Sequence, residues 1–215
     1  VEFVTRIRIF MISLAVETEN REAIVKTEFK NVDLIVSNMN LAGAELEIID
    51  KQNRESILKN ALADVWENYD FIFLDCPPSL GLITLNALAA SNSVIIPIQS
   101  EYFALEGLGK LLQTIRIVQG SEEDGPGVNP ALTIEGFVVT MFDGRTKVHT
   151  QVLAELREHF GPLVFKSIIQ RNVRLSEAPS YGKSIIYYDI KCNGSTNYLS
   201  LAREVLEKNE RITNE

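Results

Sequence analysis

The amino-acid sequence predicts an α/β fold, with a mostly parallel sheet covered by helices on both faces. Strand-like apolar runs alternate along the chain with segments of helical periodicity. Two of these runs, 71–74 and 93–97, are apolar at successive positions, which is typical of strands buried on both faces of a parallel sheet. The chain has 215 residues, 46% of them hydrophobic, which is enough for one α/β core, so we expect a single domain over 1–215.

The expected elements follow one another in a regular order. Strands are predicted at 32–36, 71–74, 93–97 and 134–141, and helices at 54–66, 82–90, 103–118, 148–160 and 197–208. The first helix carries an apolar side that should cover the sheet, formed by Ile57, Leu58, Ala61, Leu62 and Val65.

Turn-forming residues set the ends of several elements. The helix 82–90 is small and apolar nearly all round, so we expect it to be buried directly after the loop that begins at Asp75. Gly161-Pro162 ends the helix 148–160. A polar, turn-rich loop at 121–130 separates the third helix from the last strand.

The net charge of −8 argues against a generally basic nucleic-acid-binding protein. The charge is uneven, however, because residues 141–192 have a local excess of +3 while the remainder carries −11. The basic residues of this stretch are Arg145, Lys147, Arg157, Lys166, Arg171, Arg174, Lys183 and Lys191. Charge alone favours a solvated face over a binding patch here.

Cysteine usage and hydropathy indicate a protein of a reducing compartment. Cys76 and Cys192 are far apart, and the chain has no CxxC pair or histidine cluster, so we expect neither a zinc site nor a disulfide. No apolar run approaches the roughly 20 residues of a membrane span, and residues 1–14 make a poor signal peptide. We expect a cytoplasmic location.

The run from Phe71 to Gly81 is the strongest candidate for a site. A buried strand that ends in Asp75, followed by a loop and a helix start, suits magnesium-phosphate chemistry, because the carboxylate can hold Mg²⁺ directly or through water and helix-end amides favour anions. Pro77 and Pro78 stiffen the loop. The alternative is a simple strand-to-helix turn in which Asp75 caps the helix 82–90 or pairs with a neighbour.

A phosphate-binding loop does not precede this run. The first glycine of the chain is Gly43, and no glycine-rich loop ending in Gly-Lys-Ser or Gly-Lys-Thr occurs upstream of Asp75. The sequence therefore carries only half of a nucleotide site.

Several ordered sequence blocks resemble the ParA/Soj chromosome- and plasmid-partitioning ATPases, which are deviant-Walker P-loop NTPases related to MinD. The resemblance extends from about residue 23 to about residue 207, and residues 1–22 match poorly. Its blocks are Ser37-Asn-Met-Asn-Leu-Ala-Gly-Ala-Glu45, Asp75-Cys-Pro-Pro-Ser-Leu-Gly81, Leu85-Asn-Ala-Leu88, Pro97-Ile-Gln-Ser-Glu-Tyr-Phe-Ala-Leu-Glu-Gly-Leu108, Thr140-Met-Phe-Asp143 with Arg145-Thr146, and Arg171-Asn-Val-Arg-Leu-Ser-Glu-Ala-Pro-Ser-Tyr-Gly182.

This resemblance implies ATP and Mg²⁺ as family cofactors and a role for each block. Asp75 would act on Mg²⁺ through water, and the loop Pro77, Pro78, Ser79 and Gly81 would respond to the terminal phosphate. An adenine pocket would be formed by Thr140, Met141, Gln170, Arg171 and Asn172.

Family members also bind DNA non-specifically as ATP-bound dimers, through arginines that correspond to Arg145 and Arg174. Such contacts are independent of sequence and sensitive to salt. The alternative for this pair is that both are solvated surface arginines or internal loop struts.

Departures from the family pattern limit what the chain can do alone. The first strand, the Lys-Gly-Gly-x-x-x-Lys-Thr loop, the first helix and the strand ending in Asp-x-Asp-Pro-Gln do not occur in this sequence. Phosphoryl transfer depends on placed charge, so we expect no ATP hydrolysis by this chain alone. Without a central first strand, neighbouring strands would keep unpaired edges, unless residues 4–14 or another chain fill part of the gap.

Milder substitutions occur near the expected sites. Gln170 stands where the family usually has proline, and Lys147 could add to a basic surface. We interpret His149 as an exposed helix-start residue, not a ligand or base, because no partner acid or cysteine is evident.

Three functional hypotheses follow. The first is a partitioning ATPase that dimerises with ATP, binds nucleoid DNA and responds to a ParB-type partner. The second is a non-catalytic interaction protein that pairs with a full-length relative, a ParB-type protein or DNA. The third is a MinD-like membrane-associated ATPase, which the mixed charges of residues 199–212 argue against, since a membrane surface favours a basic amphipathic helix.

Overall fold

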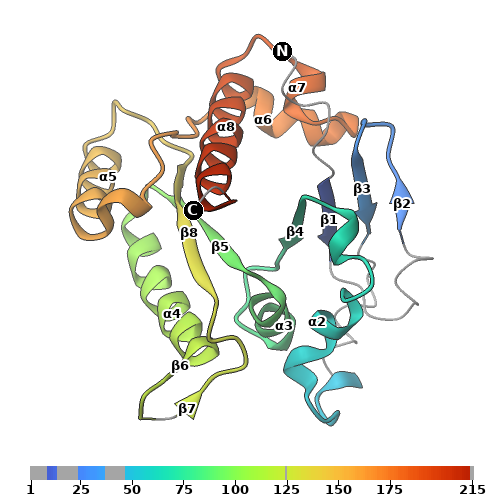
Figure 1. Ribbon diagram of the computed structural model, residues 1–215. Helices are drawn as coiled ribbons and strands as arrows, with labels where there is room; N and C mark the ends of the chain where they lie inside the picture. The colour runs from blue at the N-terminus through green and yellow to red at the C-terminus, as the bar shows by residue number, and fades with distance from the viewer. Residues whose placement is uncertain (1–8, 14–23, 37–46, 124, 214–215) are drawn as a thin grey trace. The chain divides into compact units, whose positions relative to one another are not determined.

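The computed structural model describes residues 9–13, 24–36, 47–123 and 125–213 (Figure 1). The chain forms two compact units, one made of Val1–Asn92 with Leu111–Leu132 and the other of Ser93–Lys110 with Thr133–Glu215. Each unit has its own sheet. One block of the family resemblance, 37–45, lies outside the described residues. The structure describes all the other blocks.

A four-stranded, mostly parallel sheet forms the first unit. Its strands are β1 (Ile9–Ser13), β2 (Val25–Lys26), β3 (Val32–Ile35) and β4 (Phe71–Asp75), in the order β2-β3-β1-β4. β1 is parallel to both β3 and β4, whereas β2 is antiparallel to β3. Part of the segment 4–14 therefore does form an interior strand of the sheet.

β4 lies at the edge of this sheet, which differs from the central position that its apolar sequence predicts. Among the described residues, β1 is its only strand neighbour. Phe73 in this strand keeps 40% of its surface exposed.

Helices cover one face of the sheet in the first unit. The region predicted as one helix at 54–66 is broken into η1 (Arg54–Ser56), α2 (Ile57–Ala61) and η2 (Trp66–Asn68). The first break coincides with a contact from α3 (Leu82–Ala90), whose buried Asn86 side chain accepts a hydrogen bond from Leu58 N and donates one to Arg54 O. The core of this unit contains Ile35, Leu58, Leu62, Val65, Ile83, Ala87 and Ala90.

A short hairpin replaces part of the loop expected at 121–130. β6 (Gly120–Ser121) pairs antiparallel with β7 (Gly125–Pro126). Gly120 has φ of +82°, and a Cβ atom there would lie 2.1 Å from the backbone N of Gly127. Only glycine, which has no Cβ atom, fits where these two backbone segments lie so close together.

Two parallel strands form the centre of the second unit, β5 (Ser93–Gln99) and β8 (Thr133–Thr140). β8 is buried at five successive positions, 135–139, as expected for a strand covered on both faces. The backbone that follows η3 (Gly161–Leu163) runs along β8, because Phe165 N donates to Phe137 O and Ile169 N to Val139 O.

Three long helices belong wholly or partly to the second unit (Figure 1). They are α4 (Tyr102–Gln119), which continues into the first unit, α5 (Lys147–Phe160) and α8 (Asn193–Thr213). All three match sequence expectations, although α8 is longer at both ends than the predicted 197–208. Lys208 of α8 fixes this helix to β8 by donating to Glu135 O.

Short helices occupy the segment between the strand-like backbone and α8. They are α6 (Val173–Glu177), η4 (Ala178–Tyr181) and α7 (Ile185–Tyr188), none of which the sequence periodicity predicted. Within the described part of the chain, no helix combines the length and apolar character needed to cross a membrane.

Candidate functional site

The carboxyl end of β4 presents Asp75 at the surface of the first unit. Its side chain is exposed and makes no hydrogen bond or ion pair with another described residue. The N-cap of α3 is Gly81, and no side chain caps that helix. Asp75 is therefore neither a helix cap nor part of an ion pair in the described structure, and its charge is available to a ligand.

The loop after Asp75 is held to α3 at its far end. Thr84 Oγ1 donates to Ser79 O at 2.6 Å, and Leu85 N donates to Gly81 O at 3.1 Å. Pro78 and Ser79 are exposed, while Pro77 is half-buried. The helix thus anchors the second half of the loop and leaves its outer residues accessible.

Cys76 lies next to the free carboxylate. Desolvation by the surrounding chain, with a further contribution from the negative charge of Asp75, raises the pKa of the Cys76 thiol to about 11. The thiol is therefore protonated at neutral pH, and because thiolates are the reactive form, Cys76 is a poor nucleophile and metal ligand.

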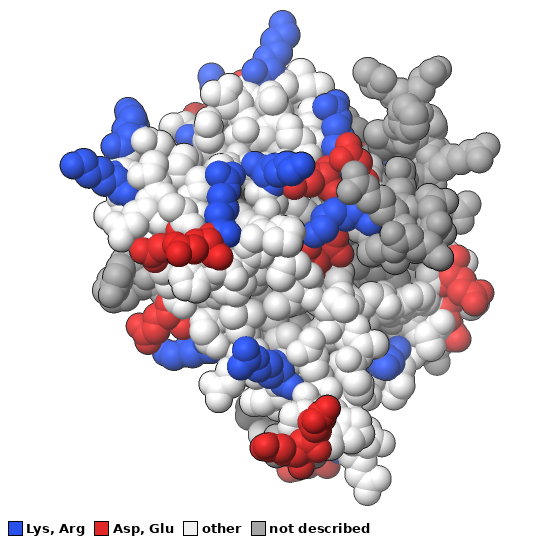
Figure 2. Space-filling view, turned by 60° about the vertical axis from the view of Figure 1, so that its left-hand side comes forward, with Lys and Arg blue, Asp and Glu red and all other residues white. Residues whose placement is uncertain are grey.

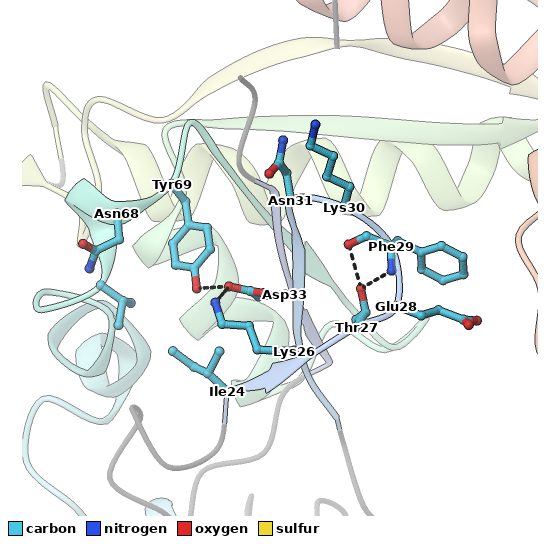
Figure 3. Close-up of a pocket in the computed structure, with 11 residues that line it drawn as sticks. Ile24, Lys26, Thr27, Glu28, Phe29, Lys30, Asn31, Asp33, Asn68 and Tyr69 are labelled. Carbon is cyan, nitrogen blue, oxygen red and sulfur yellow. Dashed lines mark hydrogen bonds and ion pairs between the residues drawn. The ribbon is translucent and has the colours of Figure 1, made fainter. Parts of the chain in front are cut away.

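A cavity of about 780 Å³ lies at the opposite end of β4, near the starts of β3 and β4 (Figure 3). On one wall, Asp33 accepts hydrogen bonds from Lys26 Nζ and from Tyr69 Oη, the latter at 2.7 Å. The lining mixes lysine, acidic and amide side chains, without the excess of one charge that a phosphate or a metal ion requires. Within the described residues, no group of three or more His, Cys, Asp or Glu side chains could hold a metal ion.

In the second unit, two separate segments of the predicted adenine pocket meet. Phe142 N donates to Ile169 O at 3.1 Å, and Arg171 N donates to Phe142 O at 3.0 Å, so residues 140–142 run parallel to 169–171. Thr140 and Gln170 therefore come from neighbouring chain segments. The fold brings together what the sequence separates by about thirty residues.

Side chains and backbone strain shape this crossing. Met141 has φ of +53°, an uncommon conformation for a residue with a Cβ atom, and keeps 41% of its surface exposed. Asn197 Oδ1 accepts from Gln170 N at 3.2 Å, and Asn172 Oδ1 accepts from Arg174 N at 2.8 Å as the N-cap of α6. Both ends of the 170–172 segment are thus fixed by side-chain amides.

Arg145 extends from the loop before α5 and is 91% exposed. Its Nε donates to Asp143 Oδ1 at 2.9 Å and its Nη2 to Asp143 Oδ2 at 2.7 Å, while its backbone N donates to Oδ1 at 3.0 Å. These bonds hold the pKa of Asp143 far below its ordinary range, so the carboxylate stays ionised.

His149 lies in the first turn of α5, so it is a helix-start residue as the sequence suggested, but it is not fully exposed. It is half-buried, its Nδ1 accepts from the Asp143 N–H at 2.9 Å, and its ring lies 6.1 Å from that of Phe142. The interpretation missed this contact because it considered only side-chain partners.

Arg174 in α6 is held by two carboxylates. Its Nη1 donates to Glu177 Oε2 at 2.9 Å, and its Nε lies 3.7 Å from Asp189 Oδ2. Tyr188 Oη also donates to Glu177 Oε2, at 3.1 Å. Arg174 therefore links α6 to the end of α7 and still keeps 54% of its side chain exposed.

Sequence reasoning named both arginines and missed their carboxylate partners. Glu177 lies three residues after Arg174 within a helix, a spacing that places side chains side by side. Asp143 lies two residues before Arg145. On the face shown in Figure 2, basic and acidic side chains alternate instead of forming one continuous basic patch.

Comparisons with known proteins assign the chain to a family. A family model described as "AAA domain" matches residues 4–134. The chain is 51% identical over 184 residues to the sporulation initiation inhibitor protein Soj of Bacillus subtilis, covering 86% of this chain and 70% of the relative. The chain belongs to the ParA/Soj family. It is also 48% identical to the chromosome partitioning protein ParA of Myxococcus xanthus, covering 87% of this chain and 64% of that relative.

A solved structure extends the ParA/Soj assignment to the fold. The crystal structure of cobyrinic acid a,c-diamide synthase from Mycobacterium smegmatis with bound ADP and magnesium superposes with a TM-score of 0.67 at 31% identity, covering 78% of this chain and 76% of that one. The P-loop NTPase type of α/β fold expected from the sequence is thereby confirmed, as is the ParA/Soj resemblance.

Proposed function

We propose that this chain carries the magnesium-sensing loop, the adenine pocket and the DNA-contacting arginines of a chromosome- or plasmid-partitioning ATPase. The observation that carries the proposal is Asp75, an exposed carboxylate at the carboxyl end of a parallel strand, which a short loop joins to the helix α3. That edge of a parallel sheet is where α/β proteins bind ligands. Membership of the ParA/Soj family supports the same reading.

The donor chemistry of Asp75 fits Mg²⁺. A hard cation prefers oxygen ligands and often keeps its water molecules, so one exposed carboxylate can hold it through water. When bound, the ion would neutralise phosphate charge. Asp75 would orient the hydrated ion, and Pro77, Pro78, Ser79 and Gly81 would form the loop next to the terminal phosphate.

The crossing of 140–142 with 169–172 suits the base of the nucleotide. Thr140, Met141, Gln170, Arg171 and Asn172 provide an exposed thioether, amide side chains and backbone polar groups, which are suited to contacting a flat, polar ring. The solved structure with bound ADP and magnesium, at 31% identity, supports a nucleotide as the ligand.

We expect no ATP hydrolysis by the 215-residue chain, since its sequence contains no glycine-rich phosphate loop with the lysines and threonine that the reaction needs. The measurement is phosphate release from Mg-ATP, with and without duplex DNA. A release rate that Asp75→Ala abolishes would contradict this expectation.

The DNA-binding part of the proposal rests on Arg145 and Arg174. Contacts from these side chains to phosphates would be non-specific, and they would place the protein on cytoplasmic nucleoid DNA. The family's partners are a second copy of the chain and a ParB-type protein, and we propose the same partners here. The chain would then work as a homodimer or with a full-length relative.

DNA retention tests this part directly. The double variant Arg145→Ala/Arg174→Ala should bind a labelled duplex of mixed sequence more weakly than the wild type at low salt, because two phosphate contacts are lost. Each lost contact should lower the slope of log K against log salt by about 0.9. The matched control is Arg157→Ala/Arg203→Ala, which removes two exposed arginines from α5 and α8. Equal retention of all three proteins would remove Arg145 and Arg174 from the proposed role.

A further inference from the structure

The two carboxylate oxygens of Asp143 occupy one whole edge of the Arg145 guanidinium. Nε and Nη2 form this edge, and they donate to Oδ1 at 2.9 Å and Oδ2 at 2.7 Å. The same edge offers two parallel N–H groups, which is the arrangement that holds a phosphate in a bidentate manner. A phosphate that approaches this Nε–Nη2 edge of Arg145 therefore meets a site that an internal anion already fills.

The structure of the loop keeps this internal anion in place. Asp143 Oδ1 also accepts from Arg145 N at 3.0 Å, so the carboxylate is fixed to the backbone of the residue whose side chain it binds. The Asp143 N–H is in turn held by His149 Nδ1 at 2.9 Å. The carboxylate is thus held beside the arginine by the loop itself.

The neighbouring cation Lys147 provides a contrast. It is exposed and forms no ion pair with another described residue. A phosphate can therefore bind Lys147 without displacing a protein group, whereas binding to the Nε–Nη2 edge of Arg145 requires the Asp143 pair to open.

We infer that Asp143 is an internal competitor of the DNA phosphate at Arg145 and lowers the affinity of the chain for DNA. This inference rests on the proposed function, since it concerns the same arginine. It adds an affinity-setting residue that acts through Arg145 and touches no DNA itself. Neutralising Asp143 with asparagine removes the negative charge and the acceptor of Nη2, so an anion no longer closes the guanidinium edge, while Oδ1 can still accept from Arg145 N.

The test uses Asp143→Asn in the 215-residue chain. Asparagine keeps an oxygen that accepts from Arg145 N, so the loop hydrogen bond survives while the charge is lost. We expect about fivefold tighter binding to a labelled duplex DNA at low salt, the upper end of what opening an exposed ion pair costs. The charge control is Glu158→Gln, which removes one exposed acid of α5 that is not paired with an arginine.

A double-mutant cycle separates competition from general repulsion. If Asp143 acts through Arg145, Asp143→Asn in an Arg145→Ala background raises DNA binding no more than Glu158→Gln does, so no gain beyond the general charge effect remains. The inference is overturned if Asp143→Asn binds as the wild type does, binds more weakly, or gains no more than Glu158→Gln. It is also overturned if the gain persists without Arg145.

These outcomes can be told apart from a failure of the proposed function. If the proposed function fails, the wild type itself shows no DNA binding, or Arg145→Ala binds DNA as the wild type does. If the wild type binds, Arg145→Ala weakens binding and only Asp143→Asn is silent, the proposed function stands and the competition is refuted.

Discussion

The loop after β4 and the loop before α5 each follow a parallel strand, yet they differ in whether another side chain binds their charged residue. Asp75 forms no ion pair with another described residue, whereas Arg145 is bound on one edge by Asp143. A charged residue at a ligand-facing strand end is therefore not always available to a ligand. If a neighbouring loop residue already binds the charged side chain, a ligand has to replace that interaction. If no neighbour binds it, the ligand adds a new interaction.

The strands that lead into these loops differ as well. β8 is buried on both faces, and Phe137 at its centre is fully buried, with its ring 4.4 Å from that of Phe160. β4 has one strand neighbour among the described residues and exposes Phe73. The candidate site of the second unit therefore follows a strand that is buried on both faces. The candidate site of the first unit follows a strand with one strand neighbour among the described residues.

Truncating one phenylalanine in each strand gives the largest expected contrast. Phe137→Ala should lower the free energy of unfolding by about 3–5 kcal/mol, because it opens a cavity in a close-packed core. Phe73→Ala should cost about 1 kcal/mol, since much of the ring is already in water. Denaturant unfolding followed by circular dichroism measures both. Equal losses would mean that β4 is covered in solution, for example by another strand.

The sequence predicted the positions of these two strands along the chain well, because apolar runs leave few alternatives to a buried strand. It could not place β4 at an edge, since apolar character on both faces indicates a central strand whether or not a partner is present. The first break in the 54–66 helix was also out of reach, because it involves Asn86, which lies some thirty residues further along the chain.

The candidate site was predicted in part. Family motifs named Arg145 and Arg174, but charge counting treated Asp143, Glu177 and Asp189 only as a local sum. The i, i+3 spacing of Arg174 and Glu177 was a readable signal. By contrast, the 3.7 Å approach of Asp189 depends on the turn after α7, whose helix is too short to show periodicity.

Carboxylates that accept hydrogen bonds from the protein and carboxylates that accept none should also differ in their contribution to the free energy of unfolding. Glu204 of α8 accepts hydrogen bonds from Lys166 N at 2.7 Å and Ser167 N at 3.0 Å. Partial burial acts to raise its pKa, but these backbone donors outweigh burial and lower the pKa below the ordinary value of 4.5. Glu204→Gln should cost about 1 kcal/mol of unfolding free energy at neutral pH.

The sign of the pH dependence follows from the lowered pKa of folded Glu204. Its contribution is fully present above the unfolded pKa and is lost as the pH falls through the lower, folded pKa. The difference between wild type and Glu204→Gln should therefore shrink as the pH drops below 4.5. Asp75→Asn, which removes a carboxylate with no internal donor, should leave stability within about 0.5 kcal/mol. A constant Glu204→Gln difference down to low pH would contradict the assignment.

The smallest expected effect is at Cys76, which can report on the charge of Asp75. In a Cys192→Ser background, alkylation by iodoacetamide should be slow at neutral pH, because the Cys76 pKa of about 11 leaves little thiolate. The raised pKa of Cys76 has two causes, and Asp75→Asn removes the smaller one, the negative charge of Asp75. Desolvation remains, so alkylation should accelerate by a few-fold at most. A cation bound at Asp75 should act in the same direction, so magnesium should speed alkylation in the Asp75 protein and not in Asp75→Asn. An identical magnesium response in both would place the ion elsewhere, and the free carboxylate would lose its proposed ligand.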